Sequence, residues 1–504
     1  MQKKCLIGID VGTSGVKVLA LASDGAIIRS AIEAYPLYTP KAGWTEQDPA
    51  DWWTGTKKAL KQVLEHCREY EVAAVGLSGQ MHGMVALDAD MQVVRKAILW
   101  NDQRTDQQCR EITELAGGEA GLLALTNNQM LTGYTGGKIR WLQQNEPELY
   151  EQTRWILNPK DYIRWLLSGE RLTEVSDASG TGLYDVKNNQ WSLELLEKLD
   201  IDPDMLPPVV ESTAAAGTVS EKAAAETELR PGTLISGGGG DAVISTTGLG
   251  LVRPGRIGVT LGTSGVVAMG LPEFMPNPEG SLQVFRGNAP DTFTAMGVTL
   301  AAAGSYEWFR NALGQHERAQ AKEQGKSAFY LLDQAAAKTP AGADDMIFLP
   351  YLTGERCPVF DPNARGAFIG LTGLHEKGHF SRAVLEGVAY SLRQVFELIV
   401  GANRSWIEAK EVVLAGGGAV SPVWRQIFAD VFQLPVHTVY GSAEGGSFGA
   451  ALVAGVTAGI WKDLNDAVKL VKPETETLPD PENKEVYDKL YTRYKKLYGA
   501  LKLT

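Results

Sequence analysis

Residues 7–20 read IGIDVGTSGVKVLA, and residues 257–270 read IGVTLGTSGVVAMG, so one motif occurs twice in the chain. In each copy an apolar strand pattern leads into Gly-Thr-Ser-Gly and then into a second apolar strand, which predicts a β-hairpin with a tight turn. The repeat predicts two related domains. Because 504 residues are too many for one core and suit two of about 250 each, we place the domains at 1–251 and 252–504.

The turn of this motif has the chemistry of an anion site. Its glycines expose successive backbone N–H groups, and the Thr and Ser hydroxyls add donors for phosphate oxygens. The two copies differ where the first has Asp10 and the second has Thr260. A carboxylate beside phosphates is a ligand that Mg²⁺ prefers, so the first copy predicts a cation near bound phosphates. The alternative interpretation is a duplicated structural hairpin.

The composition argues against several classes of function. The net charge is −12 and the isoelectric point is near 5.2, which argues against sequence-independent binding to nucleic acid or to an anionic membrane. The 4 cysteines lie apart without CxxC spacing, which predicts reduced thiols in a cytoplasmic protein. No apolar run approaches the roughly 18 residues of a spanning helix.

Polar segments in the first half of the chain follow predicted strands. A helix is predicted over 49–67 with Asp48 as its N-cap. A strand at 72–78 ends in a glycine-flanked segment with His82, where open α/β sheets bind ligands; a buried structural histidine is the alternative. Asp102, after a strand that begins at residue 97, either accepts hydrogen bonds from sugar hydroxyls or caps the next helix. Asp177 is either functional or part of a turn.

Glycine-rich turns mark two places further along the chain. A strand at 233–236 is followed by four glycines, by Asp241 and by a helical pattern at 242–247. A carboxylate exposed to a ligand at a helix start suits a general base, and an N-cap is the alternative. A second such turn follows a strand at 412–415, and its bare backbone fits against a nucleotide. A small-residue helix after Glu444 is expected to pack against it.

One motif suggests a different chemistry. His375 and His379 match the HExxH pattern of zinc peptidases, in which both imidazoles lie on one face of a stable helix. Gly378 weakens a helix here, and the apolar helix is predicted to begin only after Ser381. We therefore do not expect a metalloprotease. The Pro/Glu-rich segment 473–483 is predicted to be a connector to a final helix.

Several segments along the chain share a pattern with one family. They are IGIDVGTSGVK at 7–17, WTEQDP at 44–49, SGQMHG at 78–83, ILWNDQR at 98–104, PKDY at 159–162, SDASGT at 176–181, Asp241, LGTSG at 261–265, FLPYLTGER at 348–356 and AGGG at 415–418. With them the chain resembles the FGGY carbohydrate kinases, most closely the xylulokinases, nearly from end to end. The chain departs from xylulokinases at Ala242, where they usually have Asn, and at Cys357, where they usually have Thr.

The resemblance implies an α/β protein with an actin-like, ribonuclease-H-like domain in each half and a catalytic cleft between them. The first half would hold the sugar and the catalytic base, and the second half the nucleotide. Asp241 resembles the base, and Asp10 the carboxylate near Mg²⁺ and the γ-phosphate. Met81 and His82 resemble substrate contacts, with Asp102 as a third candidate. The nucleotide-side positions are Thr13, Ser14, Lys17, Gly262, Thr263, Gly417 and Gly418.

The predicted function is therefore the ATP-dependent phosphorylation of D-xylulose to D-xylulose 5-phosphate. One alternative is an FGGY kinase for another ketose or polyol, such as ribulose, gluconate, erythritol or glycerol. Another is an actin-like ATPase that uses nucleotide only to switch its binding to a partner. The polar side chains of the first half favour a small-molecule acceptor. The expected partners are a sugar and ATP, with no nucleic acid and no membrane, and a homodimer is one expected assembly.

Overall fold

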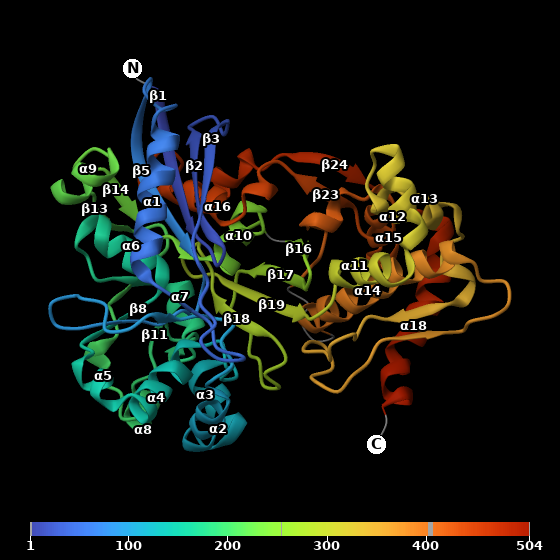
Figure 1. Cartoon of the computed structure of the whole chain (residues 1–504), viewed down its shortest axis with the longest axis horizontal. Helices are drawn as coiled ribbons and strands as arrows, with labels where there is room; N and C mark the ends of the chain where they lie inside the picture. The colour runs from blue at the N-terminus through green and yellow to red at the C-terminus, as the bar shows by residue number, and fades with distance from the viewer. Residues whose placement is uncertain (1–2, 254, 402–406, 503–504) are drawn as a thin grey trace. The chain divides into compact units, whose positions relative to one another are not determined.

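The structure is a computed structural model that describes residues 3–253, 255–401 and 407–502 (Figure 1). The chain forms two compact units whose segments alternate in sequence. Unit 1 comprises Met1–Arg253, Gly270–Thr294 and Glu444–Val471; unit 2 comprises Pro254–Met269, Ala295–Ala443 and Lys472–Thr504. Each unit has a mixed β-sheet covered by helices, which confirms the predicted α/β class.

The sheet of unit 1 is built on the first GTSG hairpin. Its order is β13-β14-β5-β1-β2-β3, and β15 also pairs with β5. Strands β1, β2 and β3 are antiparallel neighbours, whereas β5 runs parallel to β1, and β14 and β15 run parallel to β5. The bounds are β1 (Lys3–Val11), β2 (Gly15–Ala22), β3 (Ile27–Ala34), β5 (Tyr70–Gly79), β13 (Ala215–Thr218), β14 (Leu234–Ser236) and β15 (Gly239–Gly240).

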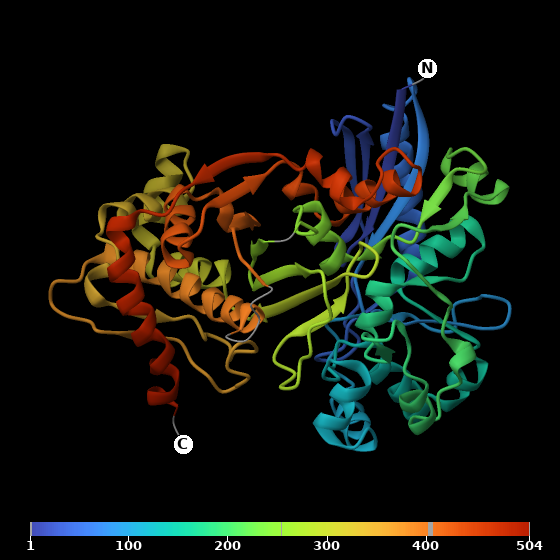
Figure 2. The ribbon, with the colours of Figure 1, turned by 180° about the vertical axis from the view of Figure 1, so that it is seen from behind.

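Helices α1 (Pro49–Leu64) and α16 (Gly446–Thr457) cover opposite faces of this sheet, as Figures 1 and 2 show from the two sides. Ile7 and Ile9 share a buried cluster with Trp52 of α1. Gly8 faces α16, where an added Cβ would lie 1.9 Å from the backbone oxygen of Ser447. The expectation that α16 packs against the second glycine-rich turn is therefore wrong, since its small residues allow close contact with β1 and β5 instead.

The sheet of unit 2 repeats this arrangement around the second GTSG hairpin. Its strands follow the order β19-β17-β16-β22-β23-β24, in which β16 and β17 form the hairpin and β22 and β23 run parallel to β16. In unit 1 the strands β3-β2-β1-β5-β14 correspond one by one to β19-β17-β16-β22-β23 of unit 2. The predicted duplication is therefore confirmed. The bounds are β16 (Arg256–Leu261), β17 (Gly265–Leu271), β19 (Phe293–Thr299), β22 (Glu411–Ala415), β23 (Val436–Val439) and β24 (Pro473–Thr477).

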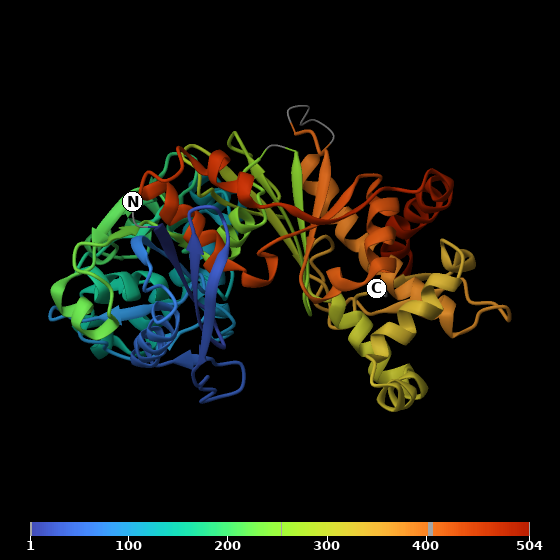
Figure 3. The ribbon, with the colours of Figure 1, turned by 90° about the horizontal axis from the view of Figure 1, so that it is seen from above.

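Several helices of unit 2 pack on one another. Three of them, α11 to α13, lie together in Figure 3, and their bounds are α11 (Ala303–Leu313), α12 (Gln315–Gln324) and α13 (Ala328–Lys338). The others named below are α14 (Lys377–Val400), α15 (Pro422–Phe432) and α18 (Lys484–Leu501). Among the described residues, none of the helices is both long enough and apolar enough to cross a bilayer.

Two predicted boundaries are wrong. The long helix α14 begins at Lys377 rather than after Ser381, because Glu376 and His379 form a capping box that starts it earlier. The predicted connector 473–483 contains strand β24, which pairs with β23.

Candidate active site

The register of three strands in unit 1 brings the predicted site residues together. Asp10 near the end of β1 pairs with Ser78 of β5, and Ser78 also pairs with Gly239 of β15. Asp241 follows β15 directly as the first residue of α10 (Asp241–Gly248), so the N-cap is Gly240 and not Asp241. Because the carboxyl ends of parallel strands meet at one edge of a sheet, residues far apart in sequence become neighbours.

Asp241 is a half-buried carboxylate with few polar partners. Its Oδ1 accepts hydrogen bonds from the backbone N–H of Ala242 at 2.7 Å and, weakly, from that of Met81 at 3.4 Å. Burial and the nearby charge of Asp10 raise the pKa of Asp241 to about 7, and the two hydrogen bonds only partly oppose this. A carboxyl group with a pKa near neutrality is suited to accept a proton.

Asp10 is the second carboxylate of the site. Its Oδ1 accepts a hydrogen bond from Ser78 Oγ at 2.7 Å. Burial raises the pKa of Asp10, while the Ser78 bond and the charge of Lys17 lower it in part. Two neighbouring carboxylates with raised pKa values favour a proton or a cation beside them.

Met81 follows β5 and is buried against the turn that carries Asp241. A Cβ added to Gly240 would lie 2.4 Å from Met81 Cγ and 2.9 Å from Asp177 Oδ1, so this position requires glycine. Met81 therefore touches the site in two ways: its side chain packs against the turn, and its backbone N–H points to Asp241.

His82 lies next to Met81 and is half-buried. Its Nδ1 lies 2.5 Å from the carbonyl oxygen of Gly180, which makes Nδ1 the donor in this bond. Its ring stacks on Tyr134 at 4.5 Å between centroids and lies 6.4 Å from the Phe285 ring. The imidazole is thus held on several sides within unit 1.

Asp102 has a different environment from the other candidates, because its side chain is fully buried. Its oxygens accept from the backbone N–H of Thr45 at 2.6 Å and from Arg104, whose Nε and Nη2 donate at 2.9 and 2.7 Å. The next helix, α2 (Asp106–Leu115), begins after Thr105, so the predicted cap is wrong. The structure places Asp102 in a buried ion pair.

The three nucleotide candidates of the first GTSG turn differ in exposure. The side chain of Ser14 is exposed, whereas those of Thr13 and Lys17 are half-buried. Lys17 forms an ion pair with Glu444 at 3.2 Å. The hydroxyl of Thr13 accepts from Trp100 Nε1 at 2.8 Å and donates to Gln80 at 3.3 Å. Trp100 and Gln80 were not predicted as site residues, although both lie in motifs of the family pattern.

A buried cluster of charged residues lies behind the Asp241 turn. Lys160 Nζ contacts Asp161 at 2.6 Å and Asp177 at 2.9 Å. Asp177 lies in helix α7 (Val175–Gly180) rather than in a turn, and burial raises its pKa more than Lys160 lowers it. Ser176 Oγ of the same helix accepts from the N–H of Gly240 at 3.0 Å. The cluster therefore supports the residue that precedes Asp241.

Unit 2 contains a cavity of about 470 Å³ at the turns that follow β16 and β22. All four nucleotide candidates of the second half, Gly262, Thr263, Gly417 and Gly418, line it. Its other walls come from α11, α13 and α15 and include Tyr306, Phe329, Tyr330, Asp333 and Trp424. These residues were not predicted from the sequence, because their helices show only an ordinary amphipathic pattern. The cavity joins bare backbone to aromatic rings, which suits a nucleotide.

The HExxH motif does not form a metal site. His375 precedes α14 and its Nδ1 accepts from the N–H of Thr372 at 2.8 Å, whereas His379 in the first turn contacts Asp344 at 3.0 Å. The histidines thus do not share a helix face. Across 3–253, 255–401 and 407–502, no cluster of three or more His, Cys, Asp or Glu side chains is arranged to hold a metal ion.

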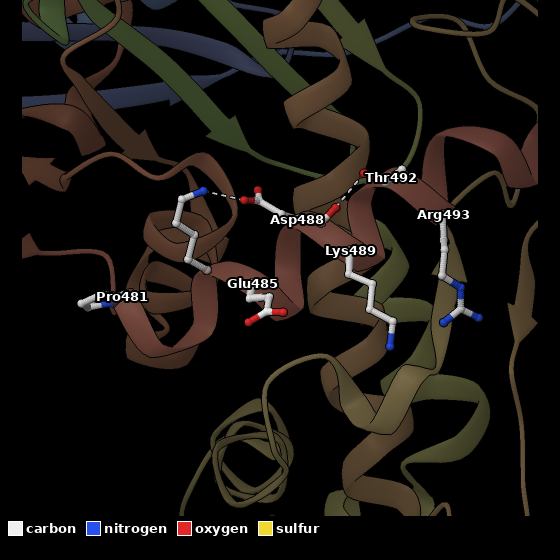
Figure 4. A pocket seen from close by; sticks show the side chains of 7 residues that line it. Pro481, Glu485, Asp488, Lys489, Thr492 and Arg493 are labelled. Atoms are coloured by element: carbon white, nitrogen blue, oxygen red, sulfur yellow. Dashed lines mark hydrogen bonds and ion pairs between the residues drawn. The ribbon is translucent and has the colours of Figure 1, made fainter.

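A second hollow, along α18, is lined mainly by charged side chains (Figure 4). Lys489 and Arg493 contact Asp345 at 3.2 and 3.3 Å, and Lys484 contacts Asp488 at 2.5 Å. These exposed ion pairs form an ordinary solvated helix surface, so we assign no site here.

The fold and the two sites define a nucleotide-dependent enzyme that acts on a small polar substrate. Residues 5–248 match the FGGY family of carbohydrate kinases, N-terminal domain, and residues 258–458 match the C-terminal domain of the same family. The chain therefore belongs to the FGGY family of carbohydrate kinases and uses ATP to phosphorylate a sugar. The alternative of an actin-like ATPase switch is thereby set aside.

Individual relatives agree with this class. The chain is 36% identical to a xylulose kinase of Bacillus subtilis over 502 residues, 99% of this chain and 97% of that protein. A crystal structure of a xyloylose kinase from Brucella ovis matches with a TM-score of 0.89 and 33% identity, covering 98% of this chain and 99% of that one. A gluconokinase of Bacillus subtilis is 29% identical over 89% of this chain and 86% of its own length.

Proposed function

We propose that the chain transfers the γ-phosphoryl group of ATP to the terminal hydroxyl of D-xylulose, with Asp241 as general base. The products are D-xylulose 5-phosphate and ADP. The observation that carries the proposal is the position of Asp241, a carboxyl group with a pKa of about 7. It follows β15 at the sheet edge where β1 ends with Asp10 and where β5 leads to His82. The choice of sugar is supported by the names of the full-length relatives.

In the proposed step a proton acceptor takes the hydroxyl proton while one bond to phosphorus forms and another breaks. Asp241 accepts the hydroxyl proton as that oxygen attacks the γ-phosphorus in line. The new bond from oxygen to phosphorus forms while the bond from phosphorus to the β-γ bridging oxygen breaks and ADP leaves. Asp241 needs its raised pKa for this step, because an ordinary carboxylate is a weaker base at neutral pH.

The residues of unit 1 fit a Mg²⁺ ion that arrives with ATP. Such ions are commonly held by one or two carboxylates together with substrate phosphates rather than by an all-protein cage. Asp10 has the required oxygen ligand, and burial gives its carboxylate few charged partners. We assign Asp10 as the protein ligand; when bound, Mg²⁺ would neutralise charge on the phosphates.

The other site residues divide between sugar and nucleotide. We assign Met81 and His82 to the sugar, since both follow β5 next to Asp241. We assign a structural role to Asp102, because its carboxylate is buried and already accepts hydrogen bonds from Arg104 and from the backbone N–H of Thr45. We assign the nucleotide to the cavity of unit 2, against Gly262, Thr263, Gly417 and Gly418. The exposed Ser14 of unit 1 stays a predicted phosphate donor.

Gluconate is the strongest alternative acceptor. A gluconokinase is among the relatives, and the chain has Ala242 where xylulokinases usually have Asn. The side chain of Ala242 is exposed directly beside the proposed base, so an amide that would bond a sugar hydroxyl is missing there.

A panel of acceptors tests the choice of sugar. We expect ADP release, measured with D-xylulose, D-ribulose, D-gluconate, erythritol and glycerol, to show the highest kcat/KM for D-xylulose. Discrimination against a poorly paired acceptor can reach about 10⁴, because buried polar groups are then left without partners.

The matched variant in this assay is Ala242→Asn, which restores the amide beside the base. If another acceptor is clearly preferred by the natural chain, the assignment to xylulose is wrong and only the class of carbohydrate kinase remains. A shift of that preference towards xylulose in the variant would then identify Ala242 as the cause.

The pKa of Asp241 predicts the pH dependence of the free enzyme. Because the pKa lies near 7, Asp241 is protonated below this pH and cannot accept the hydroxyl proton. We expect kcat/KM to fall about ten-fold per pH unit below pH 7 and to level off above it. A profile measured from about pH 5 to about pH 9 that stays flat down to pH 5 would contradict the role of Asp241.

A further inference from the structure

Lys138 is a buried amino group for which the proposed chemistry has no use. Its side chain is 0% exposed, and Nζ donates to the carbonyl oxygens of His82 at 2.6 Å and of Gly133 at 2.5 Å. Burial lowers its pKa to about 7, while the negative charge of Asp102 opposes this shift. Burial of an amino group is unfavourable unless hydrogen bonds compensate for the lost hydration, so the two bonds of Lys138 are expected to have a specific role.

The carbonyl that Lys138 holds belongs to a residue with an unusual backbone. His82 has a φ of 69°, which lies in the left-handed region that residues other than glycine seldom adopt. The same carbonyl oxygen also accepts from Thr135 Oγ1 at 3.1 Å. Both donors come from the start of helix α4 (Thr135–Asn145), so one short segment fixes this conformation.

The same segment also contacts the imidazole ring. Tyr134, directly before α4, stacks on His82 at 4.5 Å, and its hydroxyl accepts from Gln283 Nε2 at 3.0 Å. On the other side, Gly180 accepts from Nδ1. Backbone and ring are thus held together, so a change at the carbonyl moves the ring.

We propose that Lys138 is a positioning residue for sugar binding: it holds the His82 carbonyl and so keeps the left-handed backbone that directs the imidazole to the sugar. The inference rests on the proposed role of His82 in binding the substrate. Without Lys138 this carbonyl still accepts from Thr135 but loses its 2.6 Å bond, so the left-handed backbone is held less firmly and the imidazole is positioned less well for the sugar.

The test is Lys138→Met, which keeps the length of the side chain and removes its donors. We expect KM for the sugar to rise about ten-fold, with kcat and KM for ATP changed less than about two-fold. The control is Thr126→Val in the same unit, which removes a buried hydroxyl bonded to Leu122 and Asn128. It should lower Tm without changing KM for the sugar. An equal rise in KM in the control would overturn the proposal.

A double-mutant cycle with His82→Ala separates positioning from a general structural role. If Lys138 acts through His82, adding Lys138→Met to His82→Ala changes KM for the sugar little; an additive effect would overturn the proposal. If Lys138→Met does not fold, Thr135→Val takes its place and must raise KM in the same direction. The assays use whichever sugar has the highest kcat/KM, so the result is independent of the identity of that sugar.

Discussion

Replacement of Asp241 by Asn is expected to lower kcat by about 10²–10⁴, the range for the loss of a positioned general base. Asn has nearly the same shape and still accepts from the N–H groups of Ala242 and Met81, but its amide cannot take up the hydroxyl proton. The fold and the affinity for ATP should therefore stay close to those of the natural chain. Steady-state kinetics, with Tm and ATP titration alongside, measure both effects.

The matched control for this variant is Asp88→Asn, which removes a carboxylate of the same unit that accepts from the N–H groups of Asp90 and Gln92 in a turn. This variant should keep nearly the full rate. If Asp241→Asn also keeps most of the rate, Asp241 is not the base and the proposed mechanism fails.

The second large effect is expected at Asp10. Asp10→Asn should lower kcat by about 10² or more and raise the Mg²⁺ concentration needed for half-maximal rate, because the removed charge is the proposed ligand of the cation. The charge of Asp10 also raises the pKa of Asp241. Its removal should therefore move the acid limb of the kcat/KM profile to lower pH, since Asp241 then loses its proton more easily.

The control here is Ser78→Ala, which removes the hydrogen bond to Asp10 and leaves its carboxyl group in place. This variant should change the Mg²⁺ requirement much less than Asp10→Asn does. An Asp10→Asn variant with an unchanged Mg²⁺ requirement and an unshifted acid limb would remove Asp10 from the cation site and from the surroundings of the base.

The two carboxylates have different positions in the duplicated fold. Asp10 belongs to the repeated hairpin, where the second copy has Thr260 at the equivalent place in β16. Asp241 has no counterpart in that motif and reaches the site through the pairing of β15 with β5. The two GTSG hairpins thus have similar turns, and only the first has a carboxylate at this position.

The features that the sequence determined by itself are local. Two GTSG turns formed the two predicted hairpins, and Asp48 caps α1, which begins at Pro49 as expected. Asp241 stands at the start of its predicted helix. Such features depend on residues within one or two turns of chain, where glycine geometry, capping and apolar periodicity act directly.

The tertiary structure alone decided which distant groups meet and what their surroundings do to them. It placed α16 against the first sheet, enclosed Asp102 with Arg104, and brought the aromatic residues of α11 and α13 to one cavity. It also raised the pKa of Asp241 and lowered that of Lys138. The physical reason is that burial and charge proximity depend on the packing of remote segments, and no short stretch of sequence contains that information.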